Sequence, residues 1–282
     1  MARIVANIIA LNPNFELRPS ANKKFREVIV FVHNYGGDRR SFGRHMDWVN
    51  ELGFDVVTFD LPLSYLRDIK ARLPVSKSWD VGLRHVWADK IEEVLGKIPE
   101  RKIIYSFSFP AVAALVAISR RHAVDVTAWI CEGGPFLDVA RGVQNVFVNN
   151  EGVLPIPPAL TISLRRWPLL QKYFTRTAQF LLGASKMEND VSSYFKMLPL
   201  GFPVLSISSE ADRLVTPDMV DQFFISGFRQ VDLQRLVLQK SDHLLGLKDE
   251  PEIYKHTVGS FLLQKGSKLT EPSPSAQRNR TT

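Results

Sequence analysis

The segment that decides the fold is RKIIYSFSFPAVAALVA, residues 101–117. A charged start and an apolar run predict a buried strand over 102–107. The alanine-rich part from Pro110 predicts a helix, because proline fits the first turn of a helix. The turn between them, Ser-Phe-Ser-Phe-Pro, either places Ser108 as an ordinary helix N-cap or exposes it as a nucleophile.

The same alternation of strand and helix recurs along the chain. Apolar, β-rich runs predict further strands at 27–33, 55–60, 126–132, 202–208 and 233–239, and a first strand near 4–11. Helices are predicted to begin at Ser41, Asp80, Pro217 and Glu250. This order is typical of an α/β fold, in which helices cover both faces of a mostly parallel sheet. Ligands of such folds bind beyond the carboxyl ends of the strands.

The regular alternation is interrupted between the strands at 126–132 and 202–208. This gap contains helical patterns at 161–182 and 187–198, and we interpret about 135–200 as a helical cap inserted over the site. Its apolar residues include Phe136 and Trp167. These side chains either seat the cap on the core or line a substrate pocket, and the sequence leaves both interpretations open.

Length and charge restrict the class of protein. The 282 residues, 45% of them hydrophobic, suffice for a single domain over 1–265, followed by a polar tail, 266–282, of disordered composition. The net charge is +7, and residues 265–282 supply +3 of it. The remaining +4 is too small to indicate a nucleic-acid partner.

The cysteine content and the hydropathy pattern indicate a cytoplasmic protein. Cys131 is the only cysteine, which excludes an intramolecular disulfide and a multi-cysteine metal site and fits a reducing compartment. No apolar run approaches the roughly 18 residues of a membrane span. The N-terminal apolar run lacks a clear signal-peptide cleavage site, so we expect a soluble cytoplasmic protein.

Two of the six histidines follow predicted strands. His33 and His243 lie at strand ends, whereas the other four fall within or at the end of predicted helices. A histidine that acts as a base needs a nucleophile within reach and, usually, a carboxylate that orients it. Ser108 and Asp212 also follow strands. The candidate set therefore runs along the chain in the order serine, aspartate, histidine.

The sequence between residues 27 and 263 resembles the α/β-hydrolase fold, whose triad has this order and whose nucleophile lies on a strand-to-helix turn called the elbow. HNYGG at 33–37 resembles the family's oxyanion loop, SSEADRLVTP at 208–217 its acid loop, and SDHLLG at 241–246 its histidine loop.

This resemblance assigns a role to each loop. It implies Ser108 as nucleophile, His243 as base and Asp212 as the acid that orients it. It also implies an oxyanion hole from the backbone N–H groups of Tyr35 and Phe109, with Asn34 as an alternative donor. We interpret His33 as a structural residue that holds the oxyanion loop.

The elbow departs from the family pattern. The usual G-x-S-x-G is replaced by Ser106-Phe-Ser-Phe-Pro110, so both flanking glycines are missing. Those glycines leave room where the strand and helix backbones approach each other. Serine is small, and Pro110 falls in the first helical turn, where a missing N–H is harmless. We therefore expect the elbow to form despite the change.

Several neighbouring residues compete for the same roles. Ser106 belongs to the strand and precedes the apex of the turn, and the side chain of Asp242 points away from its neighbour His243 in an extended segment. Glu132 lines the pocket mouth, serves as a displaced acid or is structural. Asp60 is interpreted as a cap or loop anchor. Arg39, Arg40 and Arg44 either meet an anionic substrate or form a solvated helix face.

A serine nucleophile with an oxyanion hole implies acyl transfer from an ester, thioester or amide. The phenylalanine content of the cap favours a small-molecule ester or thioester with a hydrophobic acyl or aromatic group. No cofactor is expected, because the pairs Gly36-Gly37 and Gly133-Gly134 lack dinucleotide spacing, and no metal-ligand spacing occurs. The sequence does not determine the oligomeric state.

A second hypothesis is a non-catalytic protein of the same fold that binds a hydrophobic ligand or a partner in the cap cleft. A Ser108 hydroxyl out of reach of His243, together with a helical φ at Ser108, would favour that alternative.

Overall fold

The structure is a computed structural model of the chain, and it describes residues 15–62, 83–138, 141–142, 144–145, 169, 172–173, 187–225, 227 and 229–269. The first predicted strand, near 4–11, the predicted helix at 161–182, apart from residues 169, 172 and 173, and nearly all of the predicted tail lie outside these residues.

Within the described residues, seven strands form one sheet in the order β1-β3-β2-β4-β5-β6-β7. Their bounds are β1 Phe15–Arg18, β2 Val28–Val32, β3 Asp55–Phe59, β4 Lys102–Phe107, β5 Val126–Glu132, β6 Phe202–Ser209 and β7 Val231–Leu238. Only β1 pairs antiparallel, with β3, and every other pairing is parallel. The prediction of a mostly parallel sheet is therefore confirmed, and the strand at 102–107 has the predicted bounds.

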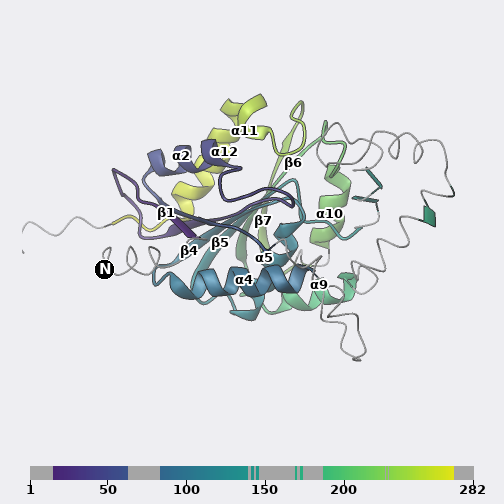
Figure 1. Cartoon of the computed structure of the whole chain (residues 1–282), viewed down its shortest axis with the longest axis horizontal. Helices are drawn as coiled ribbons and strands as arrows, with labels where there is room; N and C mark the ends of the chain where they lie inside the picture. Colours follow the sequence, from purple (N-terminus) through teal and green to yellow (C-terminus); the bar gives the residue numbers. More distant parts are fainter. Residues whose placement is uncertain are drawn as a thin grey trace, which may run out of the picture.

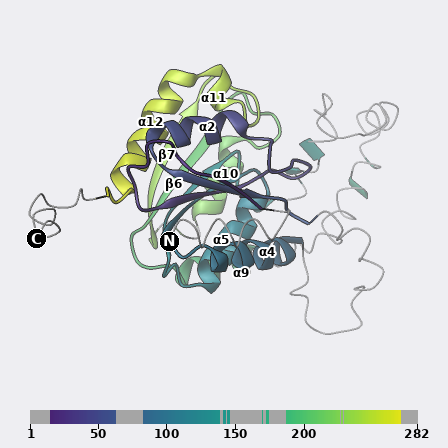
Figure 2. The same cartoon turned by 60° about the vertical axis from the view of Figure 1, so that its left-hand side comes forward.

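Helices cover both faces of this sheet (Figures 1 and 2). One face carries α2 Gly43–Leu52, α11 Gly246–Asp249 and α12 Pro251–Lys265. The opposite face carries α4 Leu83–Lys97, α5 Pro110–Arg120, α9 Met187–Lys196 and α10 Pro217–Ile225. Among the described helices, none has the length and apolar character needed to cross a bilayer.

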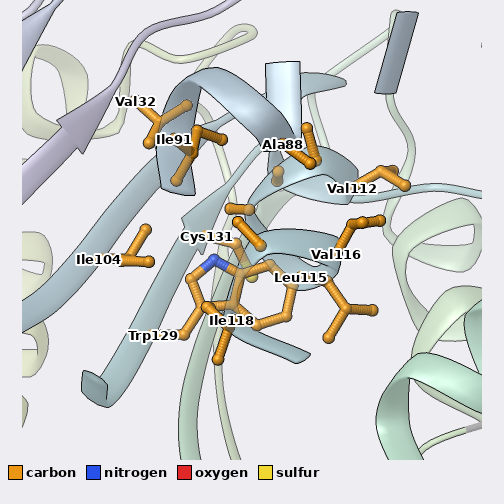
Figure 3. Packing of buried hydrophobic residues seen from close by; sticks show 14 of the residues in the cluster. Val32, Ala88, Ile91, Ile104, Val112, Leu115, Val116, Ile118, Trp129 and Cys131 are labelled. Carbon is orange, nitrogen blue, oxygen red and sulfur yellow. The ribbon is translucent and has the colours of Figure 1, made fainter. Parts of the chain in front are cut away.

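Alternation along the strands divides the buried side chains between the two faces. In β5, Trp129 and Cys131 join the core under α4, α5 and α10, whereas Ala128 and Ile130 join the core under α2 and α12. Figure 3 shows Trp129 and Cys131 packed against the apolar side chains of α5. A strand with both faces buried has a continuous apolar sequence, which is why a strand such as β5 could be predicted from the sequence. The short edge strand β1 was not predicted, and most of its residues are only partly buried.

Most of the predicted cap at 135–200 lies outside the described residues, so the cap remains a prediction. Its described ends contact the body of the protein. Asn145 donates a hydrogen bond to the Leu214 carbonyl oxygen (3.0 Å), and Phe195 of α9 is buried in the core beside α5. Trp167 lies outside the described residues.

Candidate active site

Ser108 lies at the carboxyl end of β4, directly before α5. Its φ is +56°, a left-handed conformation that a non-glycine residue adopts at a cost of about 1–3 kcal/mol. Its N–H donates to the Glu132 carbonyl oxygen (2.8 Å), and its own carbonyl oxygen accepts the Ala111 N–H (3.0 Å). Pro110 is the first residue of α5, so the helix loses no hydrogen bond there. The turn is therefore a strained, well-anchored elbow.

His243 joins Ser108 to Asp212. Its Nε2 lies 3.1 Å from Ser108 Oγ, and its Nδ1 lies 2.6 Å from Asp212 Oδ2. A carboxylate only accepts hydrogen bonds, so Nδ1 carries the proton and Nε2 is free to accept the serine O–H. The structure thus brings together the three residues that the loop order singled out, with the imidazole in the tautomer of a general base.

The other oxygen of Asp212 is held by the backbone. Asp212 is buried, and its Oδ1 accepts the N–H groups of Leu214 (2.8 Å) and Val215 (2.9 Å). These two donors fix the carboxylate and leave Oδ2 directed at the imidazole. The side chain of Asp242 is exposed, and its Oδ1 accepts the backbone N–H of His243 (2.8 Å) instead of the imidazole.

Glu250, at the start of α12, holds the histidine loop. Its Oε2 accepts the backbone N–H groups of Gln239 (3.0 Å), Lys240 (2.8 Å) and Ser241 (3.1 Å) and the Ser241 hydroxyl (2.8 Å). Burial acts to raise the pKa of this carboxyl, but the hydrogen bonds outweigh it and the pKa is lowered. The sequence around Glu250 predicts only the start of a helix and gives no sign of this contact.

His33 holds the loop at 33–37, which resembles an oxyanion loop, through both of its ring nitrogens. Leu61 donates its N–H to His33 Nε2 (2.9 Å), so Nδ1 carries the proton and donates to the Asn34 carbonyl oxygen (2.8 Å). Burial lowers the pKa of His33, which keeps the ring neutral in this arrangement. The Asn34 side chain folds onto its own loop and donates to the Tyr35 carbonyl oxygen (3.2 Å).

Two backbone donors near the elbow have no acceptor among the described residues. They are the N–H groups of Tyr35 and Phe109, the donors that the resemblance implied. Aromatic rings connect the two residues through Trp87 of α4, with centroid distances of 5.9 Å from Tyr35 and 6.1 Å from Phe109. Phe136 continues the row, 5.6 Å from the Phe109 ring. Trp87 was not among the sequence candidates, because its place beside the elbow depends on how α4 packs.

Glu132, a sequence candidate for the pocket, lies on the opposite side of the sheet from this row. Its side chain is buried on the α2 and α12 face, where its Oε2 accepts the hydroxyl groups of Tyr254 and Tyr105. His45 Nε2 is 3.7 Å from the same oxygen and has no hydrogen-bond partner among the described residues. This placement agrees with the structural interpretation of Glu132.

Ser106, the rival nucleophile, is fully buried, and its Oγ accepts the Trp129 indole N–H (2.8 Å) and donates to the Ile130 carbonyl oxygen (3.3 Å). Cys131 is also buried, and desolvation raises the pKa of its thiol. Within the described ranges, no three metal-ligating side chains gather at one place.

Solved structures of several enzymes resemble the chain. An esterase from Pyrococcus furiosus aligns with 95% of this chain and 94% of its own, with a TM-score of 0.57 and 14% identity. MenH from S. aureus aligns over 90% and 99% (TM-score 0.56, 15% identity), and proline iminopeptidase from Mycobacterium smegmatis over 89% and 94% (TM-score 0.57, 13% identity). No protein-family model and no curated protein matches the sequence. Together with the sheet order and the elbow, these likenesses show that the chain has the α/β-hydrolase fold.

Proposed function

We propose that the protein is a serine hydrolase that cleaves an ester or thioester through an acyl-enzyme on Ser108. The observation that carries this proposal is the continuous hydrogen-bonded chain Ser108–His243–Asp212 at a left-handed elbow. The alternative, a non-catalytic binding protein, predicts a helical φ at Ser108 together with a hydroxyl beyond reach of the imidazole. The φ of +56° at Ser108 and the distance of 3.1 Å from its Oγ to His243 Nε2 favour the enzyme.

The proposed reaction has two matched steps. Ser108 Oγ attacks the carbonyl carbon while its proton moves to His243 Nε2, and the carbonyl electron pair moves onto oxygen. Collapse of this intermediate breaks the bond to the leaving group, which takes the proton from His243. A water molecule then attacks the acyl carbon, gives a proton to His243 and releases the acid, and the proton returns to Ser108. Asp212 stabilises the imidazolium in both steps.

The N–H groups of Tyr35 and Phe109 are the proposed oxyanion hole. Both lack an acceptor among the described residues, and a preorganised donor is most effective when nothing else occupies it. The Asn34 side chain, which donates to the Tyr35 carbonyl oxygen, is the weaker candidate.

The substrate of this proposal carries a hydrophobic acyl or aromatic group. A row of aromatic rings is formed by Tyr35, Trp87, Phe109 and Phe136. It begins at Tyr35, whose N–H is a proposed oxyanion donor, and includes Phe109, the residue after the proposed nucleophile. Tyr35 is 40% exposed, so one end of the row is open to a ligand, whereas Trp87 is buried beneath it. Flat apolar groups bind well against such rings.

Hydrolysis of p-nitrophenyl esters of increasing acyl length tests the proposal. We expect turnover by the wild type, with a preference for longer or aromatic acyl groups, and a loss of at least roughly 10⁴-fold in kcat for Ser108→Ala and His243→Ala. Ser106→Ala is the matched control and keeps kcat within several-fold of the wild type. A Ser108→Ala variant with wild-type turnover would exclude the proposed nucleophile.

A further inference from the structure

The Gly133-Gly134 pair, which follows β5, lies against two members of the triad. Gly134 faces the main chain of Ser108. A methyl group added at Gly134 would lie 2.4 Å from the Ser108 carbonyl oxygen and 3.1 Å from its Cα. Contacts under 3.0 Å are essentially absent between real Cβ atoms and their neighbours, and a carbonyl oxygen of the main chain cannot rotate away. Only glycine therefore fits at position 134 while Ser108 keeps its conformation.

Gly133 makes the corresponding approach to the base. A methyl group there would lie 2.8 Å from His243 Cε1, 3.1 Å from His243 Nδ1 and 2.7 Å from Leu244 Cδ2. Its φ is +60°, which disfavours any side chain at this position. The Cε1 and Nδ1 atoms of the imidazole therefore lie directly beside Gly133.

Hydrogen bonds anchor this glycine pair to its surroundings. The Glu132 carbonyl oxygen accepts the Ser108 N–H (2.8 Å), and Gly133 donates its N–H to the Ile207 carbonyl oxygen of β6 (2.9 Å). The Glu132 side chain is buried and accepts the Tyr254 hydroxyl. A segment that is fixed at its start and lies against the Ser108 main chain and the His243 imidazole can determine the separation of the two residues.

We propose that Gly133 and Gly134 are positioning residues that set the Ser108 Oγ to His243 Nε2 separation. The elbow has no glycine of its own. Gly134, in the segment after the neighbouring strand β5, leaves the space that the Ser108 main chain needs. This inference rests on the proposed function, because the positioned atoms are the reacting ones. A displacement of about 1 Å in a reacting group can cost roughly 100-fold in rate.

The first test compares Gly134→Ala with Gly43→Ala, a glycine at the start of α2 with nothing within 4 Å of an added methyl group. We expect Gly134→Ala to lower kcat on p-nitrophenyl esters by roughly 100-fold, with KM within about threefold of the wild type, and Gly43→Ala to change neither. A folded Gly134→Ala protein with wild-type kcat overturns the proposal.

A second test applies if the Gly134→Ala protein does not fold. Gly133→Ala is compared with Gly201→Ala, because Gly201 has a similar φ of +73° and open space around it. Both variants carry the backbone strain, but only Gly133→Ala displaces the imidazole. We expect a fall of about tenfold or more in kcat for Gly133→Ala alone, and equal kcat values for the two variants overturn the proposal.

Failure of the proposed function gives a different result. If the wild type neither hydrolyses esters nor reacts with serine-directed reagents, a crystal structure of Gly133→Ala decides the inference by itself. An Oγ to Nε2 separation beyond 3.5 Å supports the positioning role, and an unchanged separation of about 3.1 Å overturns it.

Discussion

Two buried carboxylates lie at the ends of neighbouring strands of this sheet, and only one of them contacts His243, the candidate base. Glu132 ends β5 and Asp212 follows β6, and each is 3% exposed. Each also has a histidine nearby. The distance from carboxylate to imidazole is 2.6 Å for Asp212 and His243, but 3.7 Å for Glu132 and His45, which form no hydrogen bond.

The partners of the remaining oxygens explain the difference. Two backbone N–H groups hold one oxygen of Asp212, so the other is directed at His243. Glu132 instead points to the α2 and α12 face of the sheet, where the hydroxyls of Tyr254 and Tyr105 satisfy its Oε2. The two side chains are therefore carboxylates that are equally buried. Orientation by local hydrogen bonds separates a candidate catalytic acid from a structural one.

The largest expected effect is on activity, at Asp212. Asp212→Asn replaces the acceptor of the His243 Nδ1 proton by a group that can donate, which favours the wrong tautomer of the imidazole. We expect kcat on an ester substrate to fall by roughly 10⁴-fold while the protein stays folded. Asp242→Asn is the matched control, because Asp242 bonds only the backbone of His243 through its side chain. A fall of the same size in the control would assign the acid role to Asp242.

An effect mainly on stability is expected at Glu132. Glu132→Gln removes the charge that accepts the two tyrosine hydroxyls in a buried site. Hydrogen bonds to charged groups contribute about 1.5–3 kcal/mol, so we expect the free energy of unfolding in urea to fall by about that amount. The loss in kcat should be far smaller than for Asp212→Asn. If Glu132→Gln instead lost activity as severely, the comparison between the two acids would fail.

A smaller effect, on the free energy of unfolding at alkaline pH, is expected at Tyr254. Burial, followed by the nearby Glu132 charge, raises the pKa of Tyr254 well above its ordinary value of 10. Above pH 10 the unfolded chain releases this proton and the folded protein keeps it, so its contribution to stability falls as pH rises, by up to about 1.4 kcal/mol per pH unit. Tyr254→Phe removes this dependence. The gap in unfolding free energy between wild type and Tyr254→Phe should therefore narrow from pH 9 to pH 11, and a constant gap contradicts the assignment.

The sequence contained enough information to predict the sheet and the three loops of the candidate triad. Strands buried on both faces produce apolar runs, and Ser108 and Asp212 follow two such strands, β4 and β6. His243 follows β7, an edge strand in which apolar and polar residues are mixed. Parallel strands bring their carboxyl ends to one edge, so residues far apart in the chain could be grouped before any contact was known. The mostly parallel sheet is confirmed, whereas the roles of the three residues stay proposals.

Contacts made across the sheet could not be predicted in the same way. The approach of Gly134 to Ser108 depends on the path of the chain after β5. In the sequence, the pair Gly133-Gly134 shows only that the spacing of a dinucleotide-binding motif is absent. Likewise, alternation along β5 places Glu132 on the same side as Ile130, but the sequence does not state which helices cover that side. The contact of Glu250 with the histidine loop depends on the shape of the turn that brings them together, and the residues beside Glu250 in the sequence do not predict that shape.

Covalent labelling shows whether His243 activates Ser108. The purified protein is treated with a fluorophosphonate, and the modified peptide is identified by mass spectrometry in the wild type, Ser108→Ala and His243→Ala. We expect one adduct, on Ser108, that disappears in Ser108→Ala and forms far more slowly in His243→Ala. An unlabelled, folded wild type, or an adduct on another residue such as Ser106, would contradict this activation.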